Sequence, residues 1–420
     1  MDFSLSPEQE QFRDAVRGFS QRHLAEDALA RAHAGGFPWQ IAGLLAQQGL
    51  LGITVPESDG GQGGSLLDAV LAIEEVARVC PRSADVVQAG NFGPLRTFSE
   101  LASEEQKARF LPDLLAGKAL IAVGMTEPEA GSAVTDLVTT ASRDGSGYRI
   151  NGTKVFTTNS PDASLFLVYV RFGDGVGGIG SVLVEAGAEG FSRGRPSRFM
   201  GGDAWCQLYF DNCFVPAENV LVPAGGFKRQ MSGFNAERLG NAARSLSVGS
   251  LAFDIAREHA QQRRQFGRLL CDFQGLQWKF AEMAMRLEAS RLLLYRAASN
   301  ADRGLPSEYE TAIAKAHCNE TGFHVANESL QVMGGLGFTE ECLVEYCVRR
   351  ARGWMIAGGS VEILKNMIAE SVFQRRFPQR APSGRKDEAN GAAANGRQHV
   401  INGAKAAKGR LANGHPRKDG

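Results

Sequence analysis

The sequence predicts an α+β protein in which a small β domain lies between two helical domains. Apolar residues recur at helical spacing over about the first 120 residues and again, in long blocks, in the second half of the chain. Between these parts, short β-rich runs alternate with turn residues. We therefore expect an N-terminal helical domain, a middle β domain, a C-terminal four-helix bundle and a disordered tail, at residues 1–122, 123–228, 229–380 and 381–420.

The composition limits the class of protein. The chain has 420 residues, 43% of them hydrophobic, and its 46 basic residues balance its 46 acidic residues, so nucleic acid is not expected as a partner. No apolar run is long enough to span a membrane, and no signal peptide is recognisable. The seven cysteines show no CxxC spacing and the seven histidines no HExxH motif. We expect reduced thiols, no metal and a cytoplasmic location.

The helical parts carry recognisable boundaries. Ser6, Pro7 and Gln9 form the start signal of a first helix, with a cap, a proline at the first position and a reciprocal capping side chain. The glycine-rich stretch at 50–65 lacks the Gly-Lys-Ser/Thr of a phosphate-binding loop, so we interpret it as an irregular surface connection. Four later blocks have helical periodicity, at 236–261, 273–302, 306–335 and 341–375.

The middle part has the pattern of a β domain. Asn151-Gly152 lies between two alternating segments of GYRINGTKVFTTN, which predicts a hairpin turn at these residues. The runs SLFLVYVRF, IGSVLVEA and QLYFDNCFV are expected to be strands, and the domain ends near VPAGG at 222–226. After Arg380, Lys and Arg outnumber Asp and Glu by 8 to 3 and large apolar residues are nearly absent, which predicts disorder.

Five motifs together resemble the acyl-CoA dehydrogenase family, in order and spacing, from Asp2 to about Arg376. They are MTEPEAGSAVTD (125–136), VFTTN (155–159), RRQFGRLLCDFQ (263–274), QVMGGLGFTEE (331–341) and AGGSVEI (357–363). The resemblance implies the acyl-CoA dehydrogenase fold and a homotetramer, a dimer of dimers, with FAD between the β domain and the C-terminal bundle. It also implies an acyl-CoA substrate and an electron-transfer flavoprotein as the electron acceptor.

The resemblance implies FAD contacts in several parts of the chain. Thr126 would hydrogen-bond the flavin ring, Phe156 replaces the family's Trp against it, and Thr158 matches the Thr near its reactive nitrogen. Arg263 and its neighbours match residues that bind the pyrophosphate and adenine of a neighbouring subunit's FAD. The expected FAD-binding residues are Val123, Met125, Thr126, Gly131, Phe156, Thr157, Thr158, Arg263, Gln265, Phe266, Gln274, Gln331, Val332, Gly334, Gly335, Ser360 and Glu362.

The same resemblance places the catalytic base on a helix. Most members carry the base in a Tyr-Glu-Gly-Thr turn, which aligns with residues 357–360, and there Gly358 replaces the Glu. The isovaleryl- and long-chain types instead carry it in a Glu-Arg-Leu motif, which Glu237-Arg238-Leu239 matches. We expect Glu237 to remove the α-proton and the Gly358 N–H to bind the thioester oxygen. Since both positions would approach one α-carbon, moving the carboxylate from 237 to 358 is expected to restore part of the activity.

The expected substrate-binding residues are Ser132, Asn235, Arg238, Ala357 and Gly359. Small residues at 357 and 358 open space beside the acyl chain, which favours a short, branched or cyclic acyl group. Trp354 is expected either at the floor of that space or in the bundle core.

The chain also departs from the family pattern. Ala133 replaces an Asp, and Arg350 replaces another and so reverses a charge. Two other activities stay open: dehydrogenation of an acyl or aminoacyl thioester tethered to a carrier protein, and a flavin oxidase or monooxygenase on the same fold. A non-enzymatic scaffold is disfavoured by the retained Glu237 and flavin motifs.

Overall fold

The computed structural model describes residues 4–301 and 306–380 of the chain. Residues up to Val372 form one unit, and residues from Phe373 onward form a second. The predicted disordered tail lies outside the described residues. Within the described residues, no helix is long and apolar enough to cross a membrane, and no group of His, Cys, Asp or Glu side chains could hold a metal ion.

The N-terminal part of the chain is helical, as predicted. Ser6 Oγ accepts from the Gln9 N–H at 3.2 Å and Gln9 Oε1 accepts from the Ser6 N–H at 3.1 Å, which confirms the predicted start of α1. The helices of this part are α1 (Pro7–Leu24), α2 (Ala28–His33), α3 (Trp39–Gln47), α4 (Leu66–Ala77), α5 (Pro81–Ala89), α6 (Gly93–Leu101) and α7 (Glu104–Leu115).

Residues 50–65 connect α3 to α4 irregularly, with one short 3-10 turn at Glu57–Asp59. The irregular connection is as predicted, and residues 56–64 are largely exposed. The first part is not at the surface, because Leu51, Ile53 and Val55 are buried. The Gly52 N–H also donates to the Gly90 carbonyl at 2.7 Å. Burial of apolar side chains therefore fixes this segment at the end of α5.

The middle part is a nine-stranded sheet. Its main path runs β6-β8-β3-β2-β4-β5-β9, with β1 parallel to β4 and β7 paired to β8. The three predicted β-rich runs are confirmed as β4, β5 and β8. The strands are β1 (Ile121–Gly124), β2 (Thr140–Asp144), β3 (Gly147–Thr158), β4 (Leu165–Arg171), β5 (Ile179–Glu185), β6 (Phe191–Arg193), β7 (Ser197–Arg198), β8 (Ala204–Pro216) and β9 (Val220–Val222).

The predicted hairpin turn at Asn151-Gly152 was wrong. β3 continues through both residues, and the turn lies earlier, between the paired residues Asp144 and Gly147. Gly152 has a φ of 149° at a register shift against β8, so the two residues form a bulge instead. A Cβ at 152 would overlap Thr139 Oγ1, so the glycine allows a close approach inside the sheet.

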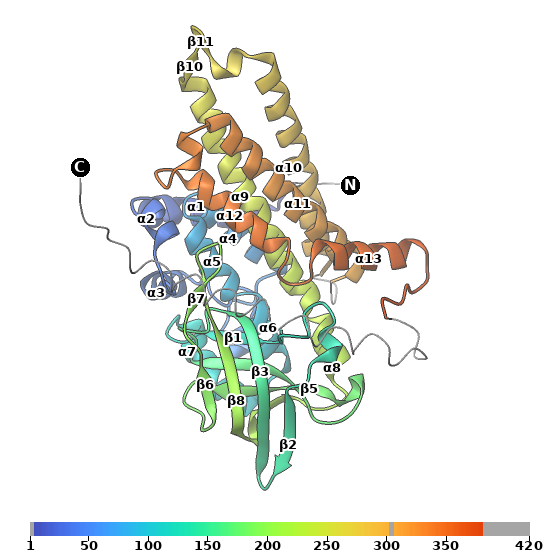
Figure 1. Cartoon of the computed structure of the whole chain (residues 1–420). Coiled ribbons are helices and arrows are strands. Elements are labelled where there is room, and N and C mark those ends of the chain that lie inside the picture. The colour runs from blue at the N-terminus through green and yellow to red at the C-terminus, as the bar shows by residue number, and fades with distance from the viewer. Residues whose placement is uncertain (1–3, 302–305, 381–420) are drawn as a thin grey trace, which may run out of the picture. The chain divides into compact units, whose positions relative to one another are not determined.

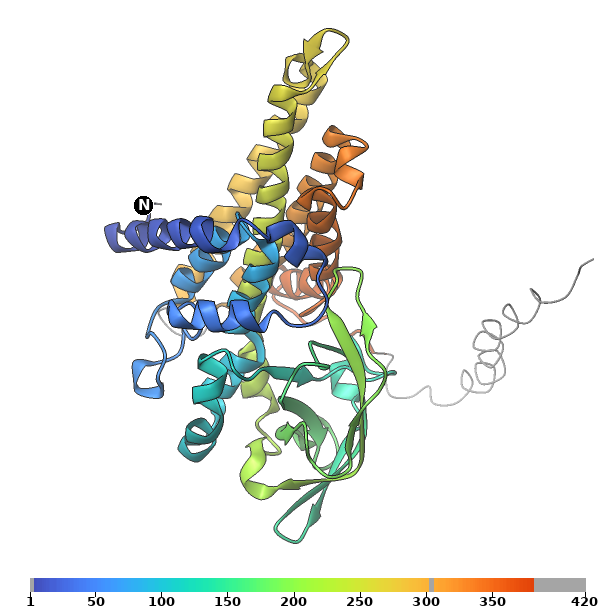
Figure 2. The same ribbon diagram turned by 90° about the vertical axis from the view of Figure 1, so that its left-hand side faces the viewer.

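The C-terminal part is built from long helices, and the last predicted block is two helices separated by a turn at 355–360. N-terminal helices α1, α3, α4 and α5 share a core with the long helices (Figures 1 and 2). The elements are α8 (Phe227–Ser232), α9 (Phe234–Gln262), β10 (Arg264–Gln265), β11 (Arg268–Leu269), α10 (Gln274–Ala301), α11 (Glu308–Met333), α12 (Leu343–Trp354) and α13 (Val361–Val372).

Helices α9 and α11 cross closely because both have a glycine at the crossing. A Cβ at Gly249 would lie 2.9 Å from the Gly322 Cα, and a Cβ at Gly322 would overlap the Ser245 carbonyl. This close packing brings the first half of α11, which carries Lys315, beside the first turns of α9, which carry Glu237 and the residues after it.

Three buried guanidinium groups surround two carboxylates where the sequence reverses the family's charge. Arg350 binds Asp203, and it binds Asp85 at 2.7 Å. Arg82 also binds Asp203, and Arg244 pairs with Asp85. Burial and the neighbouring Arg350 lower the pKa of Arg244, so its charge is held at a cost in free energy. Asp203 and Asp85 thus supply the partners that Arg350 needs.

Trp354 belongs to the same cluster. Its ring centroid lies 5.0 Å from Cζ of Arg244 and 5.2 Å from Cζ of Arg350. Guanidinium groups over an aromatic face are favourable cation–π contacts. Two positions were expected for Trp354, the floor of the substrate space or the bundle core. The contacts with Arg244 and Arg350 favour the core.

Asp203→Asn should destabilise the protein strongly, because Arg82 and Arg350 both lose a buried anionic partner. Breaking one side of a buried ion pair typically costs about 3–5 kcal/mol. The free energy of unfolding in urea measures the change. Lys365→Met serves as the control, since Lys365 pairs with Glu320 at the surface, and exposed pairs contribute at most about 1 kcal/mol. Equal losses in the two variants would contradict the role given to the cluster.

Candidate active site

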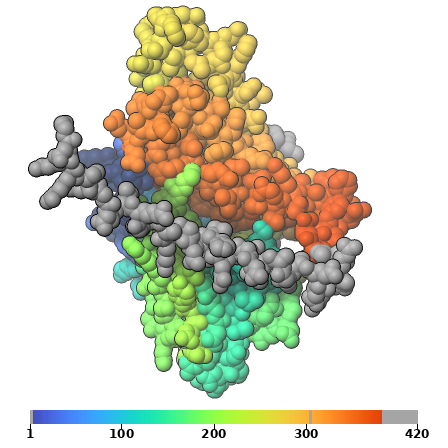
Figure 3. Space-filling model, viewed as in Figure 1, coloured from blue at the N-terminus to red at the C-terminus, as the bar shows by residue number. Residues whose placement is uncertain are grey.

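The predicted FAD-binding residues lie in two groups at opposite ends of α9. One group comes from β1, β3 and the loop between β1 and β2, near the start of α9, together with the turn before α13. The other comes from the β10–β11 hairpin and the end of α11, whose Val332 packs with the second half of α9. At 1.5 Å per residue, the 29 residues of α9 span roughly 43 Å. Figure 3 shows the hairpin end, in yellow, projecting beyond the other helices.

A buried ion pair holds the loop of the first group. Glu127 accepts hydrogen bonds from Lys154 Nζ at 2.7 Å and from the Val138 N–H at 2.6 Å, and Lys154 Nζ also reaches the Met125 carbonyl at 3.3 Å. Burial raises the pKa of Glu127, but Lys154 and the hydrogen bonds outweigh this effect, so that the pKa is lowered. Burial also lowers the pKa of Lys154, to about 8. Sequence reasoning missed this pair, although both residues lie inside or beside quoted motifs.

The aromatic ring expected against the flavin is exposed. Phe156 has a left-handed φ of 57° beside a register shift in β3, and 57% of the residue is accessible. Its ring contacts that of Trp205, with centroids 4.9 Å apart. Thr158 is exposed as well, whereas Thr157 is buried and its Oγ1 makes no hydrogen bond. The side chain of Thr157 therefore does not share a face with Phe156 and Thr158.

The residues present fit an FAD. A flat aromatic ring left exposed beside buried neighbours suits a planar ring system, and the hydroxyl of Thr158 lies on the exposed side. Gly131 and Gly335 have open space where a Cβ would stand. No residue within the described ranges fills that space, so a second molecule can approach the backbone at both ends of α9.

Glu237 is half-buried in the first turn of α9. Gln88 Nε2, from α5, lies 3.2 Å and 3.4 Å from the two carboxylate oxygens. Burial raises the pKa of Glu237 to about 7, opposed by the charge of Lys315, by the amides of Asn241 and Gln88 and by the Gly93 N–H. The Asn241 amide acts here through proximity, because its Nδ2 makes no hydrogen bond within the usual geometric limits. The carboxyl is therefore poised to exchange a proton near neutral pH.

Lys315 holds the turn that precedes α13. Its ammonium group, fully buried in α11, donates to the carbonyls of Ala357 and Gly359, both at 2.9 Å, and to that of Trp354 at 3.3 Å. Burial lowers the pKa of Lys315 to about 7, while the three carbonyl acceptors favour its charged form. Because Lys315 binds these three carbonyls, the backbone conformation of the turn is fixed. No pattern in the sequence indicates this contact.

Gly358 has no room for a side chain. Its φ is 67°, and a Cβ there would overlap Asn241 Nδ2 and lie 3.7 Å from Lys315 Cε. The structure therefore argues against the expectation that a glutamate at 358 could replace Glu237, since the backbone and Asn241 would both have to move.

The other expected substrate residues divide between two positions. Arg238 Nη1 donates to Asn235 Oδ1 at 2.8 Å, and Asn235 Nδ2 donates to the Pro306 carbonyl at 3.2 Å. These two buried residues stand beside the turn, since a Cβ on Gly359 would lie 4.0 Å from Arg238 Nη2. Ser132 and Ala357 are exposed, Ser132 in the loop of the β domain. Ser360 Oγ accepts from the Ile363 N–H at 3.4 Å, and Glu362 is exposed in the first turn of α13.

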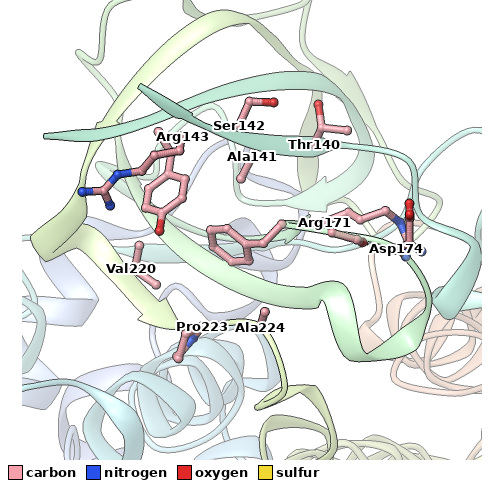
Figure 4. A pocket seen from close by; sticks show the side chains of 12 residues that line it. Thr140, Ala141, Ser142, Arg143, Arg171, Asp174, Val220, Pro223 and Ala224 are labelled. Atoms are coloured by element: carbon pink, nitrogen blue, oxygen red, sulfur yellow. Dashed lines mark hydrogen bonds between the residues drawn. The ribbon is translucent and has the colours of Figure 1, made fainter. Parts of the chain in front are cut away.

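A hollow of about 450 Å³ lies elsewhere, on the β sheet. Arg143 and Asp174 stand at opposite sides of it (Figure 4). The guanidinium of Arg171 donates hydrogen bonds to loop carbonyls, including that of Thr135 at 2.9 Å. None of the predicted site residues lines this hollow, so it is separate from the candidate site.

Comparisons with known proteins cover nearly the whole described chain. Family models for the N-terminal, middle and C-terminal domains of acyl-CoA dehydrogenases match residues 6–118, 122–213 and 224–373. A short-chain-specific acyl-CoA dehydrogenase of Clostridium acetobutylicum is 34% identical over 89% of this chain and 100% of its own length. A 3-sulfinopropanoyl-CoA desulfinase of Paraburkholderia xenovorans is 33% identical over 90% of this chain and 99% of its own.

Solved structures agree with these matches. Butyryl-CoA dehydrogenase of Megasphaera elsdenii has a TM-score of 0.83 at 32% identity, covering 89% of this chain and 100% of that one. A chain from a structural study of the electron transferring flavoprotein of Acidaminococcus fermentans has a TM-score of 0.85 at 31% identity, covering 89% of this chain and 100% of that one. An FAD complex of PigA has a TM-score of 0.84 at 26% identity, covering 89% and 99%.

Fold and site together define a three-domain flavoprotein oxidoreductase that acts on CH–CH groups. The chain belongs to the acyl-CoA dehydrogenase family and uses FAD. The expected fold is thereby confirmed. The domain boundaries drawn at 122 and 228 stay predictions.

Gly358→Ala should lower the free energy of unfolding by about 1–2 kcal/mol or more, since the left-handed backbone disfavours a Cβ and Asn241 must move. Gly353→Ala is the matched control, because Gly353 lies in α12 with open space around it, and alanine there should be neutral or stabilise by up to about 1 kcal/mol. Urea unfolding of both variants measures the difference. A change of the same sign and size in both would show that the turn tolerates a side chain.

Proposed function

We propose that this enzyme dehydrogenates short acyl-CoA thioesters between the α and β carbons, giving the trans-2-enoyl-CoA. The observation that carries the proposal is the half-buried carboxylate of Glu237, held by Gln88 beside a turn that offers backbone but no side chain at 358. The short-chain-specific relative and the butyryl-CoA dehydrogenase structure support a short acyl group.

In this proposal Glu237 accepts the α-proton of the substrate. The pKa of about 7 makes it a better base than an exposed carboxylate, yet leaves it largely ionised above neutral pH. The Gly358 N–H, in the turn fixed by Lys315, binds the thioester oxygen where negative charge develops. Bound FAD supplies the acceptor for the β-hydride. Arg238, Asn235, Ser132, Ala357 and Gly359 line the path of the thioester.

Within the short-chain class we expect branched or cyclic acyl groups to be favoured. Ala357 places little bulk beside the α and β carbons, whereas the space that a side chain at 358 would take is filled by Asn241. Trp354 stacks with Arg244 and Arg350 rather than closing this space. Differences of one methylene in such a space are worth about 1–3 kcal/mol, so the preference should be graded.

The two groups of FAD residues support a site shared between copies of the chain. An FAD held by Phe156 in one copy can meet Arg263 and Phe266 only from another copy, because the two ends of one α9 are too far apart. Phe266 is 93% exposed at a left-handed φ of 51°. Exposed Trp278, Met285 and Leu292 recur at intervals of seven on α10, which also favours a partner helix. These features support a homotetramer, a dimer of dimers.

The proposal also includes the electron acceptor and the location. The similarity to a chain described with an electron transferring flavoprotein supports such a partner. All seven cysteines are free thiols, which supports a reducing, cytoplasmic location. The two curated relatives are named for CoA thioesters, which supports CoA over a carrier-protein thioester.

Glu237→Gln should slow anaerobic flavin reduction by butyryl-CoA by roughly 10²–10⁴-fold, since the amide keeps the shape but cannot accept a proton. In the wild type the rate should rise with pH and level off above about 7. Lys315 and Arg238 are the charged groups beside the carboxyl, and loss of the Lys315 charge at higher pH broadens this rise. Stopped-flow absorbance at the flavin band measures both effects.

Glu258→Gln, at the exposed far end of α9, is the control and should leave the rate unchanged. The free enzyme gives a second readout. Because the folded-state pKa of Glu237 is raised, wild-type stability falls as pH rises from about 4.5 through about 7, and the Gln variant should lack that fall. A Gln variant that reduces at the wild-type rate would place the base elsewhere.

Arg263→Ala should lower the flavin content of the purified protein, because a pyrophosphate loses a bidentate partner supplied by a neighbouring copy. The ratio of flavin to protein absorbance, measured with mass by light scattering, tests this. Arg257→Ala is the control, since Arg257 pairs with Asp254 on the same helix. Unchanged flavin content in the Arg263 variant would show that this end of α9 does not bind the cofactor.

A further inference from the structure

Asn241 carries a buried donor without a hydrogen bond of normal geometry to any described residue, although its amide lies near enough to Glu237 to lower the pKa of that carboxyl. The residue is 1% exposed on α9, one turn after Glu237, and its Nδ2 has no hydrogen-bond partner. A buried donor left without a partner costs about 1–3 kcal/mol. Such a group in a native structure calls for a physical reason.

The orientation of the amide follows from its neighbour. Gln88 Nε2 donates to Asn241 Oδ1 at 3.4 Å. The reverse orientation would place two donors against each other, so the oxygen faces Gln88 and the NH2 group faces away from it. On that side lies the turn, where a Cβ on Gly358 would overlap Nδ2.

The other polar groups around this point are already engaged. Lys315 Nζ donates to three carbonyls of the turn. Gln88 Nε2 is shared between Glu237 and Asn241 Oδ1. Among the described groups around Glu237, Asn241 Nδ2 and Arg238 Nε are the buried donors without a partner. Nδ2 is the one that lies against Gly358, at the level where the first carbons of the acyl group must lie if Glu237 is the base.

We propose that Asn241 is a specificity-determining residue, whose Nδ2 donates a hydrogen bond to an oxygen atom on the acyl group. The preferred substrates are short acyl thioesters with an ether, hydroxyl or carbonyl oxygen near C4, rather than hydrocarbon acyl groups of the same length. This inference rests on the proposed dehydrogenation. A site built to bond such a group discriminates against the analogue that lacks it, because the protein donor is left unpaired.

The test compares two thioesters that differ by one atom. 3-Methoxypropanoyl-CoA has an oxygen where pentanoyl-CoA has C4, and both have hydrogens on the α and β carbons. The ratio of kcat/KM for the ether to that for the hydrocarbon is measured in the wild type and in Asn241→Leu. We expect the ratio to fall by about 5–150-fold in the variant. The intrinsic effect of the ether on reactivity is the same in both enzymes and cancels.

Ser245→Ala is the matched control. Ser245 lies one turn further along α9, and its buried hydroxyl also lacks a partner, but it faces the backbone of α11 at Gly322. The substrate ratio should not change in this variant. If Asn241→Leu does not retain flavin, Asn241→Ala removes the donor without adding apolar bulk or a charge, and the same fall is expected.

The outcomes separate the two proposals. Turnover of pentanoyl-CoA with an unchanged ratio in the Asn241 variants overturns the role of Asn241 and leaves the dehydrogenation standing. Absence of flavin reduction by any thioester overturns the dehydrogenation. In that case calorimetric titration of the two thioesters still decides on Asn241, because a Kd ratio that is equal in wild type and variant contradicts the hydrogen bond.

Discussion

The buried ammonium group of Lys315 is the constraint on which the arrangement of the proposed active site depends. It donates hydrogen bonds to the carbonyl of Trp354, at the end of α12, and to those of Ala357 and Gly359 in the turn before α13. From α11, its charge also acts on the carboxyl of Glu237 in α9. It can do so because Gly249 and Gly322 let α9 and α11 approach closely. The proposed proton acceptor, Glu237, and the proposed oxygen-binding N–H, that of Gly358, thus lie on separate elements, and Lys315 contacts both of these elements.

The N-terminal helices complete this arrangement rather than merely covering it. Gln88 at the end of α5 orients both Glu237 and Asn241. The same helix carries Arg82 and Asp85, which join the charge cluster of Arg244, Arg350 and Asp203. Since Asp203 belongs to the β domain, α5 connects all three parts of the chain at the level of the site.

Sequence alone predicted the fold and the family, for definite physical reasons, while the predicted site residues stay predictions. Periodicity and caps gave the helices, and five spaced motifs gave the family. The bulge at Gly152 was missed because its cause, the closeness of Thr139, is a contact between strands. Lys315, Gln88 and Asn241 were missed because each matters through a neighbour on another helix. The burial of Thr157 follows from a register shift that no local pattern records.

The placement of the predicted FAD residues at both ends of α9 has a consequence for how the enzyme retains its cofactor. In the proposed shared site, FAD would need residues from two copies and would stay bound only as long as those copies stay together, so cofactor loss and dissociation would share one equilibrium. Excess FAD then stabilises the assembly by mass action, and dilution releases flavin without any change in the residues that hold it. Holoenzyme formation becomes a property of concentration as well as of sequence.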